Sequence, residues 1–176
     1  QSNIRVISIE KVKTDPTNSE ENNYQSEQNK LLVSIKYQDN DRIICMYTDK
    51  INIIENGQET TLFENNDKKI TSQSINLDNY FTTIQEESSG IFSANSVANI
   101  VNVDTKDIKN YTVETSVKEI YTKGDIIALN LGTEVEFINT GGWLVKWYVA
   151  SQEITNVTVS NSIAGIIYRD KIELIN

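Results

Sequence analysis

The sequence offers few side chains that could do chemistry, and the first of them is a single cysteine. Cys45 lies within the apolar run 43–47, and the chain contains no histidine. Without histidine there is no Cys–His or Ser–His pair, and the commonest general base and metal ligand are missing. One cysteine also excludes an internal disulfide and a thiolate zinc site. We therefore predict that Cys45 behaves as a buried apolar side chain.

Acidic side chains are the remaining candidates for catalysis or metal binding. Glu134 and Glu136 are two residues apart, so in a strand they share one face, and glycoside hydrolysis uses such a pair of carboxylates around a cleft. Nothing in the sequence marks either one as buried, which a catalytic acid requires. The acidic and amide turns at 20–21, 39–41 and 65–67 could bind Ca²⁺. None of them fits the calcium loop with its central Gly and terminal Glu, and they are expected to be solvated turns.

Motifs for nucleotide binding or nucleophilic catalysis are absent from the sequence. There is no Gly-rich phosphate loop, no Ser nucleophile elbow and no His–Glu metal motif. The sequence therefore predicts a protein that is not an enzyme, with no catalytic residue, no metal and no cofactor.

Two tryptophans are the strongest candidates for ligand binding. Trp143 and Trp147 are four residues apart in a predicted strand, which would place both on one face with Val145 between them. The indoles could pack between repeats, or they could form a platform for a sugar or a peptide. The platform is favoured if Tyr148 and Tyr168 lie nearby and exposed. The candidate ligand-binding residues are Trp143, Trp147 and Tyr148.

The composition of the whole chain favours β-structure and disfavours polyanionic partners. The 176 residues include 25 Ile, 13 Val and 16 Thr but only 5 Ala and 8 Leu, and β-branched side chains suit strands better than helices. The formal net charge is -9, which argues against nucleic acid or an anionic membrane surface as a partner. Abundant Ile, Asn and Lys indicate an AT-rich genome, so a low-GC bacterium is the expected source.

Short apolar alternations separated by turn residues predict a single all-β domain over 1–176 with essentially no helix. Residues 1–3 resemble the remnant of a cleaved tag. The polar, acidic segment 13–30 is predicted to be a mobile loop, and 85–95 an insertion between strands. The predicted strands are 4–10, 31–37, 42–48, 50–55, 58–63, 69–76, 79–85, 97–103, 107–113, 116–122, 125–131, 133–139, 142–149, 153–159, 162–168 and 171–175.

An internal repeat gives the architecture. A shift of 37 residues superimposes 95–139 on 132–176 without a gap, and an earlier copy at 47–54 matches 168–175. Four units of about 40 residues, each with up to four strands, are typical of β-propeller blades. The chain could form a small ring or half of a larger propeller, and a β-sandwich is the alternative. Strand 4–10 could close a ring by pairing with 171–175, which would remove two exposed edges.

The tail GWLVKWYVASQEITNVTVSNSIAGIIYRDKIELIN, residues 142–176, resembles the terminal blades of quinoprotein-like (PQQ-like) β-propellers. It is similar in particular to a clostridial family of membrane-anchored propeller-like proteins with no assigned function. In that superfamily a strand ends in Asp-x-x-x-Gly-x-x-x-Trp, and here only Gly141, Gly142 and Trp143 correspond to it. Counterparts of the cofactor-binding and calcium-binding residues are missing. The resemblance implies the architecture and a cell-surface location, without dehydrogenase activity.

Taken together, these observations predict a non-catalytic interaction or scaffold domain of a bacterial cell-envelope protein that binds a protein partner. The expected location is the extracellular space or the cell envelope, with contact to the membrane only through an anchor outside the given sequence. The alternative is a glycan- or peptide-binding module that uses the aromatic surface.

Overall fold

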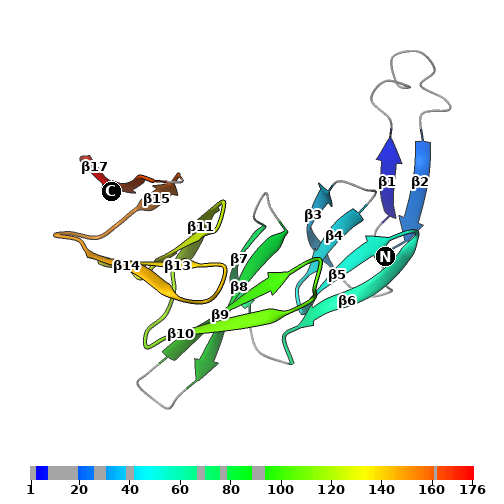
Figure 1. Ribbon diagram of the computed structural model, residues 1–176, viewed down its shortest axis with the longest axis horizontal. Coiled ribbons are helices and arrows are strands. Elements are labelled where there is room, and N and C mark those ends of the chain that lie inside the picture. The colour runs from blue at the N-terminus through cyan, green and yellow to red at the C-terminus, as the bar shows by residue number, and fades with distance from the viewer. Residues whose placement is uncertain are drawn as a thin grey trace. The chain divides into compact units, whose positions relative to one another are not determined.

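A computed structural model of the chain describes residues 3–7, 20–25, 31–38, 42–66, 70–75, 79–88, 94–160 and 162–176. Every regular element among these residues is a β-strand (Figure 1). The described residues therefore include no helix that could cross a membrane. The all-β prediction is confirmed, as the excess of β-branched side chains over Ala and Leu requires.

The strands follow one another at short intervals, and every predicted strand overlaps an observed one. Strand β2 is an element that the sequence did not predict. The strands are β1 (Asn3–Ile7), β2 (Glu20–Gln25), β3 (Leu32–Gln38), β4 (Arg42–Tyr47), β5 (Lys50–Glu55), β6 (Gln58–Glu64), β7 (Ile70–Ile75), β8 (Tyr80–Ser88), β9 (Ala94–Asn102), β10 (Ile108–Val113), β11 (Glu119–Lys123), β12 (Ile126–Asn130), β13 (Glu134–Asn139), β14 (Leu144–Val149), β15 (Asn156–Val159), β16 (Ala164–Ile167) and β17 (Ile172–Ile175).

The strands form successive antiparallel meanders, in which each strand pairs with its neighbours in the sequence. The sheets are β3-β4-β5-β6, β7-β8-β9-β10, β11-β12-β13-β14 and β15-β16-β17, and β1 and β2 form a separate pair. A series of small meander sheets, each built by one stretch of chain, is the arrangement of propeller blades. The prediction of blade-like repeats is confirmed.

The sequence repeat coincides with the strands. A shift of 37 residues carries β11, β12 and β13 onto β15, β16 and β17. The more distant match carries the turn between β4 and β5 onto the turn between β16 and β17. Both turns also repeat a cation–π contact, because Lys50 Nζ lies 5.9 Å from the ring centre of Tyr47 and Lys171 Nζ lies 4.9 Å from that of Tyr168.

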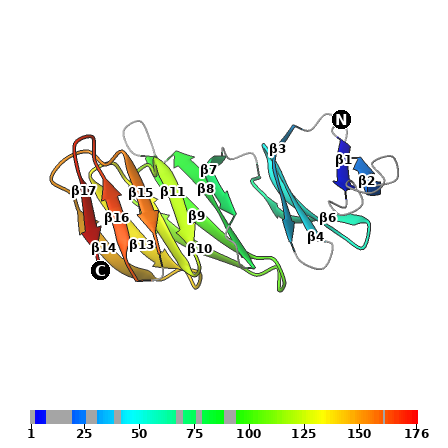
Figure 2. The same ribbon diagram turned by 90° about the horizontal axis from the view of Figure 1, so that it is seen from above.

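The described contacts divide the chain into two compact units, residues 1–64 and residues 65–176. The prediction of a single domain stays a prediction. Within the second unit, β11 contacts β7 on one side and β15 on the other, and β12 also contacts β15. The first strands of successive sheets therefore lie near one another, and the sheets of this unit follow in layers (Figure 2).

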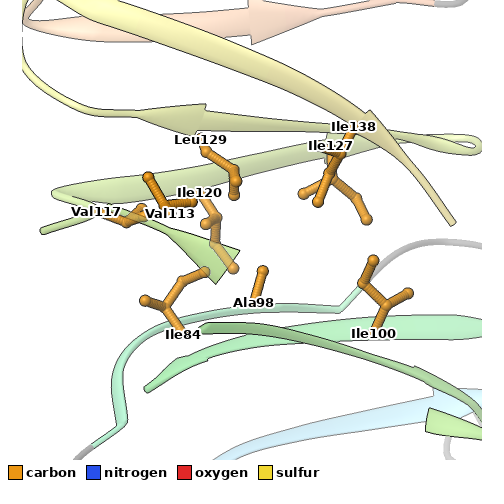
Figure 3. Packing of buried hydrophobic residues seen from close by; sticks show 9 residues of the cluster. All are labelled: Ile84, Ala98, Ile100, Val113, Val117, Ile120, Ile127, Leu129 and Ile138. Atoms are coloured by element: carbon orange, nitrogen blue, oxygen red, sulfur yellow. The ribbon is translucent and has the colours of Figure 1, made fainter. Parts of the chain in front are cut away.

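Two layers of buried side chains in the second unit lie one on each face of the sheet β11–β14. Side chains from β8 and β9 meet side chains from β12 and β13 in the first layer (Figure 3). That layer consists of Ile84, Ala98, Ile100, Val113, Val117, Ile120, Ile127, Leu129 and Ile138. The second layer consists of Ala128, Val135, Phe137, Ile154, Val157, Ala164, Ile166 and Tyr168. Because successive strand residues point to opposite faces, β12 supplies Ile127 and Leu129 to one layer and Ala128 to the other.

The core of the first unit is built on its two central strands. The buried side chains Ile43, Cys45, Tyr47 and Ile54 form one cluster. All residues of β4 and β5 except Arg42 and Glu55 are buried, so these strands carry buried apolar side chains on both faces, together with the polar Lys50 and Asn52. The prediction that Cys45, within the apolar run 43–47, is a buried side chain is confirmed.

Pairing of the chain ends stays a prediction, because strands 4–10 and 171–175 belong to different compact units. In the described residues β1 pairs with β2, from Asn3 opposite Gln25 to Ile7 opposite Glu20. A partner about 20 residues away in the chain closes a far shorter loop than a partner at the opposite end, at a lower cost in entropy. Residues 8–10 of the predicted strand lie outside the described residues.

The polar segment 13–30 is not a loop throughout, because residues 20–25 form β2. The prediction of a loop is wrong there, since backbone hydrogen bonds to β1 supply what the side chains lack in strand propensity. The remainder of the segment lies outside the described residues. The predicted insertion at 85–95 is also corrected in part, because Gln85 pairs with Val97 and Ser88 with Ala94, which extends the β8–β9 hairpin.

The layered core predicts unequal costs for two identical substitutions. Leu129 is fully buried between sheets, whereas Leu174 is 74% exposed on β17. We expect Leu129→Ala to lower the free energy of unfolding by about 2–5 kcal/mol, through lost apolar contacts and a cavity. Leu174→Ala is expected to change it by less than about 0.5 kcal/mol. Urea denaturation followed by circular dichroism measures both, and similar costs for the two variants would contradict the layered packing.

Candidate functional site

A tight turn places Trp143 immediately before β14. The side-chain Oδ1 of Asn139 accepts hydrogen bonds from the backbone N–H of Gly141, at 3.1 Å, and from that of Trp143, at 3.0 Å. The N–H of Asn139 donates in turn to the carbonyl of Trp143, at 3.0 Å. Gly142 has φ +79°, a conformation that glycine adopts without strain. Asn139 and Gly142 thus fix the start of β14 and the position of the indole.

The two tryptophans do not lie in one regular strand, contrary to the prediction. Trp143 precedes β14, and an irregularity in the pairing with β13 leaves Val145 without a partner. Glu136 faces Trp147 and Ile138 faces Leu144 across the strands. An extra residue of this kind is a β-bulge, and it breaks the simple alternation from which a shared face was predicted. The sequence gives no signal for the bulge.

Both indoles are largely exposed. Trp143 has 73% of its surface exposed and Trp147 has 57%. The neighbouring Leu144, Val145 and Val149 are exposed as well. Strand β14 lies at the edge of its sheet, so these residues form an apolar edge, which we call the β14 ribbon (residues 143–149). Packing of the indoles between repeats, one of the two interpretations, does not describe these exposed rings.

The edge strands β6 and β10 are different in character from β14. Strand β6 exposes mainly polar side chains, and so does β10, apart from Ile108. The exposed polar residues are Gln58, Thr60, Thr61 and Glu64 on β6 and Lys109, Asn110 and Thr112 on β10. Polar side chains at an edge discourage pairing with other chains. The β14 ribbon lacks this protection along most of its length.

Trp147 lies beside the pair of carboxylates that the sequence singled out. Its Nε1 donates to Oε2 of Glu134 at 3.1 Å, and Glu136 is its direct partner across the strands. Glu136 accepts a hydrogen bond from Tyr111 of the preceding sheet. Partial burial and this bond together raise the pKa of Tyr111 to about 12. The two carboxylates therefore accept hydrogen bonds from an indole and a phenol, and their charges make this face of the ribbon acidic.

Tyr148 has a different environment from Trp147. Its hydroxyl donates to Glu173 on β17 and lies 2.9 Å from the hydroxyl of the buried Tyr168. Tyr168 also donates to Oε2 of Glu173, at 2.9 Å, and Lys171 Nζ lies 2.6 Å from Oε1. Consecutive strand residues point to opposite faces, so Tyr148 faces the last sheet while Trp147 faces the other way. Binding by Trp143, Trp147 and Tyr148 together stays a prediction.

The contact of Tyr148 with Glu173 repeats an earlier one. Tyr111 and Glu136 join β10 to β13 of the next sheet, and Tyr148 and Glu173 join β14 to β17 of the sheet after it. Tyr148 follows Tyr111 by 37 residues, and Glu173 follows Glu136 by the same period of the sequence repeat. Sequence comparison superimposes these residues, but only the structure reveals that they form a repeated contact between sheets.

A small apolar cavity of about 150 Å³ opens beside the ribbon, between the last two sheets. The ribbon contributes Val145 and Lys146, and the amine of Lys146 donates to the backbone carbonyl of Asn176. The cavity is lined further by Ile126, Phe137, Val159, Ile163, Ala164 and Ile175. No sequence pattern indicates this cavity, because its walls depend on how two sheets pack.

The other predicted candidates are not gathered into a site. Residues 39–41 and Asp67, proposed as turns, lie outside the described residues. Within the described part of the chain no three acidic, cysteine or histidine side chains come together as a metal site. Cys45 is fully buried, and burial together with the charge of Glu59 raises the pKa of its thiol to about 12.

Solved structures resemble the chain in fold. Hsv2 of Kluyveromyces lactis aligns with a TM-score of 0.56 at 15% identity, over 87% of this chain and 50% of its own. A Bacteroides caccae protein of unknown function aligns with a TM-score of 0.51 at 14% identity, over 89% and 65%. The extracellular domain of a hybrid two-component system from B. thetaiotaomicron has a TM-score of 0.51 at 11% identity, over 85% and 20%.

These similarities define the class of the protein as β-propeller-like, and at such low identity they show the fold alone. The β-propeller prediction, rather than the β-sandwich, is thereby confirmed. The chain spans about half the length of Hsv2. No protein-family model matches the chain. No curated protein matches it either.

Because the thiol of Cys45 is buried, we predict that it reacts slowly in the folded protein. Because the pKa of Cys45 is raised to about 12, the folded protein should hold almost no thiolate at pH 8. We expect an aromatic disulfide reagent to label Cys45 only after urea unfolds the protein. Labelling of the native protein at the rate of the unfolded chain would show that Cys45 is accessible.

The carboxylate of Glu173 predicts a pH dependence of stability. Bonds from Lys171, Tyr148 and Tyr168 lower its pKa from 4.5 to about 2. A depressed pKa stabilises the folded state above pH 4.5, and this stabilisation is lost as the pH falls towards about 2. We therefore expect Glu173→Gln to lower the melting temperature at pH 7, and the difference from the parent to shrink between pH 4.5 and 2. The exposed Glu114→Gln is the control, and a difference independent of pH would contradict the assignment.

Proposed function

We propose that this chain is a non-catalytic interaction domain of a bacterial cell-envelope protein, which binds a protein partner through the β14 ribbon. The observation that carries the proposal is the exposure of Trp143 and Trp147 on an apolar edge strand. Tryptophan is enriched among the residues that dominate binding energy at protein interfaces. An exposed apolar patch on a polar protein is typical of an interaction site.

The environments of the polar candidates support a role without catalysis. Glu134 and Glu136 are occupied by Trp147 and Tyr111, and Glu173 by three donors. Cys45 is buried and has no histidine beside it. Under the proposal these groups maintain the sheets and the face of the ribbon.

Location in the cell envelope is the second part of the proposal. It is supported by the resemblance of the tail to a clostridial family of membrane-anchored propeller-like proteins. The structural likeness to an extracellular domain of B. thetaiotaomicron is compatible with it. Membership of the clostridial family belongs to the same proposal.

A glycan-binding module is the second candidate, because exposed indoles also stack on sugar rings. The same two side chains would serve both functions. The two candidates differ in the ligand, and they differ in whether backbone groups of β14 take part.

The proposal predicts that replacing Trp147 weakens binding while the fold is kept. Random peptides displayed on phage are selected against the parent protein, and a panel of oligosaccharides is tested in parallel. We expect enriched peptides whose affinity falls by about tenfold or more in Trp147→Ala, the loss typical of an interface hot spot. Ile108→Ala on the polar edge strand β10 is the control and should bind normally.

Circular dichroism and melting temperature establish that both variants fold. Sugars that bind in a Trp147-dependent way, without enriched peptides, would favour the glycan module. Peptides that bind Trp147→Ala as tightly as the parent would show that the ribbon is not the site.

A further inference from the structure

We propose that β14 binds its partner by strand addition, and that the partner contributes an extended segment in which basic and apolar residues alternate. This inference rests on the proposed function and specifies the chemistry of the partner. It follows from three features of the ribbon: free backbone groups, acidic side chains on one face and an apolar cavity on the other.

The backbone of β14 has an edge available for pairing. The N–H of Ala150 donates to the carbonyl of Thr133 at 2.8 Å, which identifies these two residues as a hydrogen-bonded pair. Such pairs alternate with non-bonded pairs in an antiparallel ladder. Tyr148 and Lys146 therefore direct their backbone groups to β13, whereas Trp147 and Val149 direct theirs outward. Since β14 ends its sheet, these groups can pair with an added strand.

The charges on the Trp147 face favour a basic partner. Glu134 and Glu136 lie on this face beside the indole. The whole chain carries a formal charge of -9. A second copy of the chain would bring another pair of carboxylates and the same net charge, so like-charge repulsion disfavours it. Lys or Arg side chains of an added strand would meet both the carboxylates and the face of the indole.

The opposite face of the ribbon favours apolar side chains. The cavity of about 150 Å³ lies there, lined partly by Val145 and Lys146. A cavity of roughly that size accepts a benzene-sized group. Because side chains of a strand alternate between faces, a segment that places basic residues towards Trp147 places apolar residues towards the cavity. The alternating pattern of the partner therefore follows from the two faces together.

Blocked synthetic peptides test the inference on the full chain. The first probe alternates Lys with Leu or Val, the second has the same composition with its Lys residues grouped at one end, and the third alternates Glu with Leu or Val. A fourth is the first probe with alternate backbone amides N-methylated, which removes hydrogen bonds on one edge. Binding is followed by tryptophan fluorescence and by amide hydrogen exchange of β14.

We expect the alternating basic peptide to bind at least about tenfold more tightly than the other three, and its affinity to fall with added salt. Exchange at the N–H groups of Trp147 and Val149 should slow when it binds. Val149→Pro removes an outward N–H that β13 does not use, and an edge strand tolerates proline at such a position. This variant should bind the peptide at least about tenfold more weakly with an unchanged circular dichroism spectrum. The control is a second proline variant, Thr112→Pro on the polar edge strand β10.

The outcomes separate this inference from the function on which it rests. Phage-selected peptides that bind in a Trp147-dependent way, without slowed exchange in β14 and without loss in Val149→Pro, would overturn strand addition and leave the interaction domain standing. Equal binding of the acidic and basic peptides would overturn the basic partner. A chain that associates with itself through β14 would make a second copy the occupant. If neither selected nor designed peptides bind, both proposals fail. Should Val149→Pro not fold, the N-methylated peptide tests the same hydrogen bonds from the other side.

Discussion

Burial of the sheet β11–β14 on both faces is the constraint on which the second unit depends. Strand β12 has Ile127 and Leu129 on one face and Ala128 on the other, and each set contacts a different neighbouring sheet. Strand β12 is therefore apolar from Ile126 to Leu129, whereas β13 alternates the buried Val135 and Phe137 with Glu134 and Glu136. The exposed apolar side chains of this sheet lie on its outer strand, β14.

Much of the fold could be predicted from the sequence, because its signals are local. Alternating apolar residues located the strands, and the 37-residue period identified the blade-like repeats. The sequence missed a strand whose pairing does not depend on apolar side chains. Strand β1 pairs with β2 although residues 20–25 have little strand propensity, since backbone hydrogen bonds are available to any side chain. No pattern of apolar residues marks a strand of this kind.

The candidate site was predictable in composition but not in geometry. The sequence singled out Trp143, Trp147 and the two glutamates, and the structure brings Trp147 and Glu134 together. A bulge at Val145 and the turn at Asn139 decide which way each side chain points, and neither leaves a mark in the spacing. The cavity beside the ribbon was invisible for a similar reason, because its walls come from strands of two sheets.

The repeated contact between tyrosine and glutamate has a consequence for how such a chain can lengthen. Tyr111 donates to Glu136 of the following sheet, and Tyr148 donates to Glu173 of the sheet after that. One 37-residue stretch therefore contains the acceptor of one contact between sheets and the donor of the next. A gene duplication that copies one whole period would therefore supply both the donor and the acceptor of a new contact between sheets. The protein could gain a sheet that already fits its neighbour, which favours tandem duplication over fusion of unrelated segments.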